Sequence, residues 1–518
     1  MFLTQCLHRG IAHHPDRIAT VYGERRRTYR QFFDRVAHAG GALRQLGVKP
    51  GDRVCVLALN SDRYLECYMG VLWAGAIVNP ANTRWSKAEI VYSLNDCEPS
   101  VLIVDDNFRS MVDGVQAEAK SVRHVIYIGE DEAPPTGMLA YERLLTEAEP
   151  VPDAFLGNSD PAAIFYTGGT TGYPKGVLLS HTNLLAAAFS RLALGYVPGN
   201  AYLHTSGLFH LTGALGVMWQ FLSGGTHIIL PGFDAEKVMA TIEKEKVTDT
   251  LLVPTMIQMI IQHPKLEQYD LSSLSTLVYG GSPIAETLLD AAIRAFPGAS
   301  FIQGYGMTEL AGAICFLPAH YHTAEGRKER KLGSAGRASV LSEIKIVDAE
   351  GQEAPRGAVG EIAVRSASTM IGYWGKPDET AAVLRDGWMH SGDGAYMDEE
   401  GFIFIVDRIK DMIVSGGENV YSAEVENAMS KHPGVASCAV IGVPSKQWGE
   451  SVHAVVVPKP DVQISAEELI AHCKGLIAGY KCPRSVEFRA TLPLSGAGKV
   501  QKGLIRAPFW EGHSRNVS

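Results

Sequence analysis

The sequence lacks the paired cysteines that hold a zinc ion or a redox-active disulfide. Its eight cysteines are scattered singly, and no two form a C-x-x-C motif. This spacing predicts core thiols in a reducing compartment. There is also no apolar stretch long enough to span a membrane, and Met1–Arg9 does not have the pattern of a secretory signal. A cytoplasmic protein is therefore expected.

An excess of basic residues is also missing. The chain has 47 Lys and Arg against 56 Asp and Glu, a net charge of −9 with neutral histidines. This balance argues against a general nucleic-acid binder and against a protein that lies on anionic membranes. No internal repeat or low-complexity segment is present. At 518 residues the chain is too long for a single core, so two or more domains are expected.

Neither common glycine motif for nucleotides is present, but a third kind of glycine loop is. Tyr166–Val177 reads Y-T-G-G-T-T-G-Y-P-K-G-V between two apolar, strand-like runs. Tyr173 and Pro174 separate Gly172 from Lys175, which excludes the Walker motif, and G-x-G-x-x-G is absent. Glycine backbones can approach phosphate oxygens closely, and the lysine adds a charge. The stretch therefore predicts a phosphate-binding loop, whereas a flexible connector would not need this lysine.

Secondary-structure patterns predict an α/β fold with a second, smaller domain. Short apolar strands alternate with amphipathic helices from Val54–Leu59 to Ser300–Gln303, which is typical of layered α/β sheets. Gly333–Val406 is richer in β-type runs and predicts a β-rich subdomain. A compact α+β module follows the charged segment Asp407–Asp411. The expected units are a large domain at 1–407, a hinge at 408–411 and a small mobile C-terminal domain at 412–518.

Further glycine-containing turns are candidate ligand sites. Gln303–Glu309 follows a predicted strand, so Tyr305 would stack on a flat ligand and Glu309 would bind Mg²⁺. Tyr279–Pro283 would form the wall of a pocket for a planar base. Asp393, in a predicted glycine-flanked turn, would accept hydrogen bonds from a ribose diol. Each of these three stretches, taken alone, also fits an ordinary turn without a ligand.

Two isolated residues have less support from their surroundings. Lys499 ends the glycine-containing loop Pro493–Gly498, from which it would deliver charge to a reacting phosphate. A solvated surface lysine is the commoner case. His210 follows Phe209 in an apolar run and also fits a packed core histidine.

Together these stretches resemble the adenylate-forming superfamily, and within it the acyl- and aryl-CoA ligases. The resemblance runs from Pro15 to Ile505, and the region Val443–Ala454 is especially similar to 4-chlorobenzoate and fatty-acid CoA ligases. It rests on six motifs in the order of that family: Y-T-G-G-T-T-G-Y-P-K-G, L-F-H, Y-G-M-T-E, S-G-D-G with D-R-I-K-D, S-G-G-E-N-V-Y-S-A-E-V-E, and the late Lys499.

The resemblance implies ATP, Mg²⁺ and CoA as ligands, and a role for each matched residue. The implied catalytic residues are Lys499, Glu309, Lys175 and His210, with Glu309 as the metal ligand. The implied ATP- and AMP-binding residues are Thr167, Gly168, Gly169, Thr170, Thr171, Gly172, Lys175, Gly281, Ser282, Pro283, Gln303, Gly304, Tyr305, Gly306, Met307, Thr308, Asp393, Arg408 and Lys499. The implied acyl pocket contains His210, Tyr279, Gly304 and Gly312, the hinge is Lys410, and the CoA-binding residues are Gly416, Gly417 and Trp448.

One position departs from the commoner family pattern. Gly168 stands where the family more often has serine, which removes one side-chain donor to phosphate. At the hinge many relatives have aspartate, and Lys410 is an accepted variant.

The implied reaction has two halves: a carboxylate and ATP give acyl-AMP and pyrophosphate, and CoA then takes the acyl group. The expected partners are a small carboxylate and CoA, without nucleic acid or a transmembrane segment, and a homodimer is compatible with the family. An enzyme that loads an amino acid onto a carrier protein is the alternative, but Ser206–Thr212 has no acidic residue to pair with a substrate ammonium. A light-emitting oxygenase has no supporting feature, and a non-enzymatic binding module ranks last. The choice between an alkyl and an aryl acid stays open.

Overall fold

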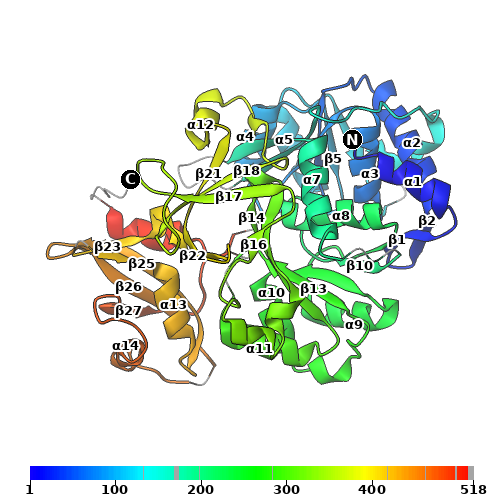
Figure 1. Cartoon of the computed structure of the whole chain (residues 1–518). Coiled ribbons are helices and arrows are strands. Elements are labelled where there is room, and N and C mark those ends of the chain that lie inside the picture. The colour runs from blue at the N-terminus through cyan, green and yellow to red at the C-terminus, as the bar shows by residue number, and fades with distance from the viewer. Residues whose placement is uncertain are drawn as a thin grey trace.

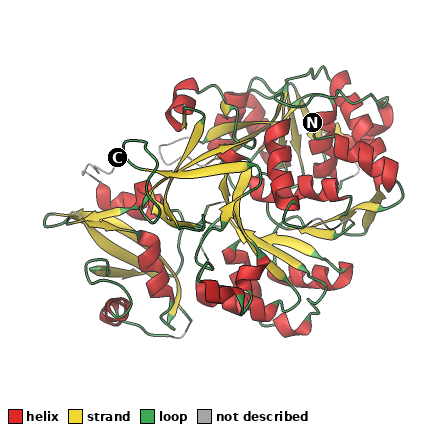
Figure 2. Ribbon diagram, in the orientation of Figure 1, coloured by secondary structure: helices red, strands yellow, loops and turns green. Residues whose placement is uncertain are grey.

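The computed structural model divides the chain into a large domain and a smaller C-terminal module at its side (Figure 1). Figure 2 shows helices packed on the sheets of the large domain and a mainly strand-built region between these sheets and the C-terminal module. The structure describes residues 1–131, 134–167, 174–195, 197, 199–282, 284–416, 418–460, 462–495 and 499–511.

Two mixed sheets form the main framework of the large domain. The described part of the first, in spatial order, comprises β16 (Arg337–Ala338), β15 (Gly312–Leu317), β14 (Ser300–Met307), β13 (Thr276–Gly280), β12 (Asp249–Leu252), β10 (Ala201–His204), β11 (Thr226–Ile229), β1 (Ile18–Tyr22) and β2 (Arg25–Thr28). The described part of the second comprises β19 (Gly372–Tyr373), β9 (Lys175–Ser180), β8 (Pro161–Thr167), β4 (Ile77–Pro80), β3 (Arg53–Leu57), β5 (Val101–Val104), β6 (His124–Tyr127) and β7 (Leu139–Ala140).

Most inner strands of these sheets are parallel and buried on both faces, because helices cover them. All four residues of β5 are buried, as expected for a parallel strand between helical layers. The helices of the large domain are α1 (Gln5–His13), α2 (Tyr29–Gln45), α3 (Asp62–Trp73), α4 (Lys87–Cys97), α5 (Val112–Glu118), α6 (Tyr141–Glu147), α7 (His181–Leu192), α8 (Leu211–Ser223), α9 (Ala235–Glu245), α10 (Pro254–Ile261), α11 (Glu286–Ala295) and α12 (Pro377–Val383). Ser180 caps α7, since its side chain accepts a hydrogen bond from the Asn183 backbone N–H at 3.1 Å.

The predicted β-rich subdomain is a third sheet. Its strands are β17 (Ser342–Val347), β18 (Gly360–Ser366), β21 (Trp388–Met397), β20 (Leu384–Arg385) and β22 (Ile403–Arg408). The chain leaves this sheet after Arg408, passes through the short 3₁₀ helix η6 (Ile409–Asp411), and enters the sheet of the C-terminal module at Ile413. The predicted hinge at 408–411 lies in this segment.

The C-terminal module has its own sheet and its own core. Its strands are β24 (Glu418–Val420), β23 (Ile413–Ser415), β26 (Gly449–Pro458), β25 (Val435–Ser445) and β27 (Ser485–Phe488), and its helices are α13 (Ser422–Ser430), α14 (Ala466–Lys474) and α15 (Lys502–Arg506). Val425, Met429, Val440, Val456 and Leu469 are fully buried in one apolar cluster within this module. The module therefore has the interior that an independent folding unit needs.

Two local expectations are wrong. Gln303 was expected to end a strand, yet β14 continues through Met307 and pairs with β15 across a bulge at Tyr305 and Gly306. Asp393 was expected in a turn, yet it lies within β21 and pairs with Arg408 of β22. In both places cross-strand hydrogen bonds keep a glycine-rich stretch extended, and a local pattern does not reveal such pairing.

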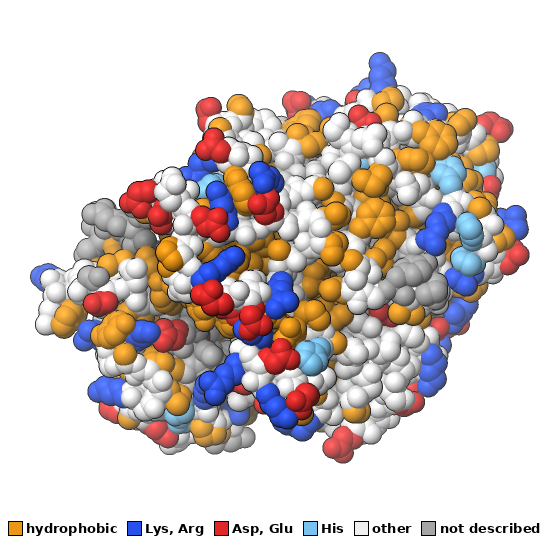
Figure 3. Space-filling view, in the orientation of Figure 1, with side chains coloured by type: hydrophobic (Ala, Val, Ile, Leu, Met, Phe, Trp, Pro, Cys, Tyr) orange, Lys and Arg blue, Asp and Glu red, His pale blue; other side chains and the backbone are white. Residues whose placement is uncertain are grey.

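The surface and the cysteines agree with the bulk composition. Within the described chain, every cysteine is free and all but the half-buried Cys438 are buried, as predicted for core thiols. On the face shown in Figure 3, acidic and basic side chains are interspersed. None of the helices in the described ranges has the length and apolar character that a membrane crossing requires.

A buried histidine pair joins two neighbouring strands of the first sheet. His204 Nε2 and His227 Nδ1 are 3.0 Å apart, and the two rings stack with centroids 5.1 Å apart. Desolvation lowers the pKa of His204 to about 3 and lowers the pKa of His227 well below its ordinary value. Both side chains are therefore neutral in the folded protein at neutral pH.

This pair is expected to make the fold acid-sensitive. Unfolded histidines titrate near 6.5, so below that pH the unfolded state binds more protons and stability falls as the pH falls. For each histidine that stays neutral in the fold, the free energy of unfolding falls by about 2 kcal/mol between pH 7.5 and pH 5. The double substitution His204→Leu/His227→Leu should reduce the loss of urea-unfolding free energy over this range, whereas the exposed control His13→Leu should not. An unchanged pH dependence in the double variant would contradict this role.

Candidate active site

Lys499 begins the last range of residues that the structure describes, and its side chain reaches toward the large domain. Its loop is closed by the Leu494–Val500 backbone bridge and by a hydrogen bond from the Ser495 N–H to the Lys499 carbonyl at 2.7 Å. The Lys499 side chain passes over Gly281, since a Cβ built on that glycine would lie 3.7 Å from Lys499 Cε. Desolvation and then the charge of Arg408 lower the pKa of Lys499, while Asp393 and Glu309 oppose the shift. The lysine therefore sits among the predicted site residues, although more than 85 positions separate it from each of them.

Asp393 links three strands at one side of this cleft. It is 6% exposed, accepts a hydrogen bond from Tyr305 Oη at 2.6 Å, and lies 3.2 Å from Arg408 Nε. Burial and the nearby Asp393 carboxylate raise the pKa of Tyr305 well above its ordinary value. The carboxylate is thus held in place by a phenol and a guanidinium, which leaves it fixed for further hydroxyl donors.

Glu309 and Lys175 approach each other through an aromatic side chain that the sequence analysis did not single out. Glu309, in the 3₁₀ helix η3 (Thr308–Leu310), is 8% exposed and accepts a hydrogen bond from Tyr373 Oη at 2.9 Å. The Lys175 ammonium lies over the Tyr373 ring, 5.0 Å from its centroid, and forms an ion pair with Glu379. The Tyr373 side chain therefore contacts both the Glu309 carboxylate, through its hydroxyl, and the Lys175 ammonium, through its ring.

This donor set fits a magnesium ion that is shared with a phosphate ligand. Mg²⁺ in nucleotide sites is commonly held by one or two carboxylates together with phosphate oxygens and waters. Glu309 uses Oε1 for Tyr373, which leaves Oε2 for an ion. Over the described ranges no group of three or more His, Cys, Asp or Glu side chains could form an all-protein metal cage.

Several predicted glycines are required by close backbone approaches. A Cβ on Gly280 would collide with the Gly304 carbonyl, and one on Gly306 would collide with the Gly312 carbonyl. Gly312 has φ +115°, a conformation that favours glycine, and a Cβ there would collide with Leu215 of α8. These glycines bring β13, β14 and β15 close together at the cleft, so their first role is steric.

His210 lies at the other side of the cleft, at the start of α8. Its backbone N–H donates to the Gly207 carbonyl at 3.1 Å, and its Nε2 is buried without a hydrogen-bond partner among the described residues. Desolvation, and then the charges of Lys499 and Arg84, lower the pKa of His210 to about 4. The side chain is therefore neutral at pH 7 and has a free nitrogen near the cleft.

Tyr279 contacts another predicted site residue, since its hydroxyl donates to Gln303 Oε1 at 3.3 Å. It is 1% exposed, its ring packs edge-on against Phe301, and its hydroxyl lies 2.9 Å from His322 Nε2. Val278, the preceding residue of β13, belongs instead to an apolar cluster with Ile302 and Phe316 on the opposite face. Because successive strand side chains alternate, Val278 rather than Tyr279 faces the side where Gly304 meets Ala313.

Gly416 and Trp448, two of the predicted CoA residues, pack against each other within the C-terminal module. Gly416 has φ +65°, its N–H donates to the Trp448 carbonyl at 2.8 Å, and a Cβ there would lie 2.8 Å from the Trp448 ring. The Arg484 guanidinium covers the Trp448 ring at 4.3 Å. Figure 1 places β23, which precedes Gly416, on the outer side of the module, away from the large domain.

The remaining predicted residues are placed as follows. Thr167 ends β8 and pairs in register with Lys175, Gly281 and Ser282 follow β13, and Met307 and Thr308 link β14 to η3. Lys410 lies in η6, and its side chain is outside the described part. The predictions for Gly168, Gly169, Thr170, Thr171, Gly172, Pro283 and Gly417 also fall outside the described residues.

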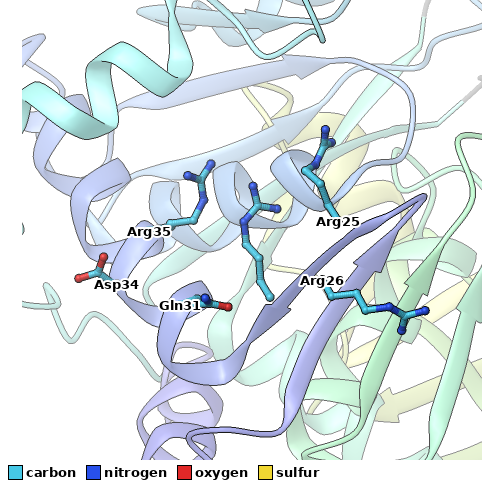
Figure 4. A pocket seen from close by; sticks show the side chains of 6 residues that line it. Arg25, Arg26, Gln31, Asp34 and Arg35 are labelled. Atoms are coloured by element: carbon cyan, nitrogen blue, oxygen red, sulfur yellow. The ribbon is translucent and has the colours of Figure 1, made fainter.

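The hollow shown in Figure 4 lies at the N-terminal side and contains none of these residues. Its lining includes Arg25, Arg26 and Arg27 of strand β2 and Arg35 of helix α2. Arg25 contacts Asp62 and Glu130, and Arg35 contacts Glu66 and Glu142 at 2.8 and 2.9 Å. Carboxylates therefore already neutralise Arg25 and Arg35. The ion pairs around this hollow fix β2 against α3.

Comparison with known proteins identifies the family. Residues 7–374 match the model of the AMP-binding enzyme family, and residues 424–499 match the AMP-binding enzyme C-terminal domain. Feruloyl-CoA synthase of an Amycolatopsis species is 41% identical over 96% of both chains. The fatty acid–[acyl-carrier-protein] ligase ScoC of Streptomyces coeruleorubidus is 35% identical over 98% of this chain and 96% of its own.

A solved structure matches over nearly the whole length. The anthranilate CoA ligase AuaEII, crystallised with anthranoyl-AMP, superimposes with a TM-score of 0.90 at 27% identity and covers 98% of this chain and 97% of its own. Both the fold class and the family inferred from the motifs are therefore confirmed. The chain belongs to the AMP-binding enzyme family and is an enzyme of the acyl-CoA synthetase class.

Proposed function

We propose that this enzyme activates a carboxylic acid with ATP to acyl-AMP and then transfers the acyl group to CoA, releasing pyrophosphate and AMP. The acid is a medium- or long-chain fatty acid or an aryl or phenylpropenoic acid. The observation that carries the proposal is the meeting of Lys499 with Asp393, Arg408 and Glu309 in one cleft. The aryl and fatty-acid names of the two relatives support this range of acids.

In the first half-reaction the substrate carboxylate attacks the α-phosphorus of ATP, and pyrophosphate leaves. The nucleophile is already an anion, so the protein must offset negative charge more than move protons. Lys499 would bridge the carboxylate and the α-phosphate, and Lys175 would leave Glu379 to bind the outer phosphates. Mg²⁺ held by Glu309 would supply further charge neutralisation on the phosphates. Asp393 and Arg408 would hold the ribose.

In the second half-reaction the small domain rotates about Lys410. This motion would withdraw Lys499 and turn the Gly416–Trp448 face toward the adenylate, so that the CoA thiol reaches the activated carbonyl. A few backbone torsions at an element boundary are enough for a domain rotation. The present arrangement, with Lys499 in the cleft and β23 on the outer side, supports an adenylate-forming orientation.

A panel of carboxylates tests the proposal. Purified enzyme is incubated with ATP, Mg²⁺ and each acid, with and without CoA, and AMP and acyl-CoA are measured. We expect CoA-dependent AMP release with at least one aryl or fatty acid. No AMP release with any acid would overturn the proposal.

Transfer to a carrier protein is a second candidate, because ScoC is named as an acyl-carrier-protein ligase. Replacing CoA with a phosphopantetheinylated carrier protein in the same assay separates the two acceptors. Faster transfer to the carrier protein than to CoA would favour this second function.

A further inference from the structure

A small polar cavity lies beside the predicted acyl pocket, under the C-terminal half of α8. Its volume is about 30 Å³, and its lining includes Arg191, Trp219, Asp249, Thr250 and Val278. A cavity of this size holds about one water molecule or one functional group. The combination of apolar walls with two oppositely charged side chains is typical of a site that orients a ligand.

Arg191 is a buried cation whose Nε is left unsatisfied by the described residues. It is 8% exposed. The guanidinium lies 5.7 Å from the centroid of the Trp219 ring. Desolvation lowers the pKa of Arg191, with Asp249 opposing the shift. A buried guanidinium is costly unless an acceptor satisfies it, so this site is suited to an oxygen supplied from outside.

Asp249 supplies the complementary half of the cavity. It is 8% exposed, and Oδ2 accepts hydrogen bonds from Asn200 at 2.8 Å and from Thr248 at 2.6 Å. Both donors use the same oxygen, which leaves Oδ1 without a donor in the described chain. One cavity therefore presents an unsatisfied donor at Arg191 Nε and, in the described chain, a spare acceptor at Asp249 Oδ1.

Helix α8 connects this cavity with His210. Residues spaced by four lie on one face of a helix, and on this face Leu215 packs against Gly312 while Trp219 and Ser223 line the cavity. From His210 to Trp219 the helix rises about 14 Å. Val278 lines the cavity and also belongs to the apolar cluster with Ala313, beside Gly304. The cavity is thus placed where the far end of an extended acyl group would lie.

We propose that the acyl pocket ends at Arg191 and Asp249, and that the enzyme selects carboxylic acids with a hydroxyl group at the end far from the carboxylate. A hydroxyl oxygen accepts a hydrogen bond from Arg191, and its proton is donated to Asp249 Oδ1. A second carboxylate would satisfy Arg191 but would be repelled by Asp249, and a plain alkyl or phenyl end would leave both charges desolvated and unpaired. The inference rests on the proposed function, because it names the acid that the same site activates.

Two matched pairs of acids test the inference: 4-hydroxycinnamate against cinnamate, and 10-hydroxydecanoate against decanoate. Within each pair only the terminal hydroxyl differs. In at least one pair we expect kcat/KM for AMP release to favour the hydroxy acid by about 10- to 100-fold, the effect of a hydrogen bond to a charged group. Arg191→Met and Asp249→Asn should each lower kcat/KM for the preferred hydroxy acid by about tenfold or more, and change that for its unsubstituted partner much less.

Arg294→Met, an exposed arginine on α11, is the matched control and should retain the wild-type preference. If Arg191→Met does not fold, Arg191→Lys and the preference of the wild-type enzyme still decide the question. Equal kcat/KM within both pairs, or equal loss for both members of a pair in the variants, would overturn the inference. Absence of AMP release with every acid would instead overturn the proposed function, so the two failures are distinguishable.

Discussion

Replacing Lys499 with alanine is expected to lower the rate of acyl-AMP formation by about 10²–10³-fold, because a positioned cation at the developing charge is worth that much. Thioester formation from supplied acyl-AMP and CoA should stay close to the wild-type rate, since the proposed rotation withdraws Lys499 before that step. The two rates are measured separately, the first as pyrophosphate release and the second as acyl-CoA formation from synthetic adenylate. The lysine acts as a cation, so adenylation should decline as pH rises through its pKa, which lies below the ordinary lysine value.

An exposed lysine of the same module provides the control. Lys459→Ala changes a lysine that lies after β26 and outside the cleft, and it should preserve both rates. Equal loss of both half-reactions in Lys499→Ala would refute the separate role of this residue. Such a result would point to damage of the module as a whole, which a comparison of thermal unfolding with Lys459→Ala would reveal.

Replacing Lys410 with proline is expected to give the opposite pattern. Proline fixes φ near −65° and restricts the residue before it, so the backbone at η6 can no longer absorb a rotation. Adenylate formation should persist, because the described orientation already has Lys499 in the cleft, while thioester formation from supplied acyl-AMP falls by about 10²-fold or more.

Lys410→Ala separates the backbone from the side chain. Alanine leaves φ and ψ free, so both half-reactions should remain near the wild-type rates. Unchanged thioester formation in Lys410→Pro would remove the argument for rotation at this residue. Loss in both Lys410→Ala and Lys410→Pro would assign the effect to the lost ammonium group instead.

The sequence could predict those parts of the fold that depend on short patterns. The alternation of short apolar strands with helices became the two large sheets, and the β-type runs within Gly333–Val406 became the sheet of β17, β18, β20, β21 and β22. Glycine-rich motifs also located much of the candidate site, because close approach of β13, β14 and β15 excludes side chains there. Where two backbones approach this closely only glycine fits, so the sequence shows such positions directly.

Features that depend on pairing between distant segments could not be predicted in the same way. Strand β1 pairs with β11, more than 200 positions later, and no local pattern specifies this register. Asp393 looked like a turn residue because only its partner strand keeps it extended. Tyr373, which contacts both Glu309 and Lys175, carries no signal in its own neighbourhood, since an aromatic residue between glycine and tryptophan has many uses.

The sequence also does not show which face of the sheet a residue of a buried strand occupies. Val278 and Tyr279 are adjacent in an apolar run, and both sides of β13 are covered, so alternation alone does not show which side holds the ligand. Packing distinguishes the two faces of β13. Tyr279 contacts Phe301 and His322, while Val278 lines the cavity beside Arg191.

The separate core of the C-terminal module has a consequence for how specificity can change. Val425, Val440 and Leu469 are buried within the module and not against the large domain. The module also carries Gly416 and Trp448, whereas Arg191 and Asp249 belong to the large domain. Under the proposed function, the choice of acid and the choice of thiol acceptor would therefore depend on two separate units of the chain. A chimera that exchanges the module between relatives should alter the thiol acceptor while the acid preference stays with the large domain.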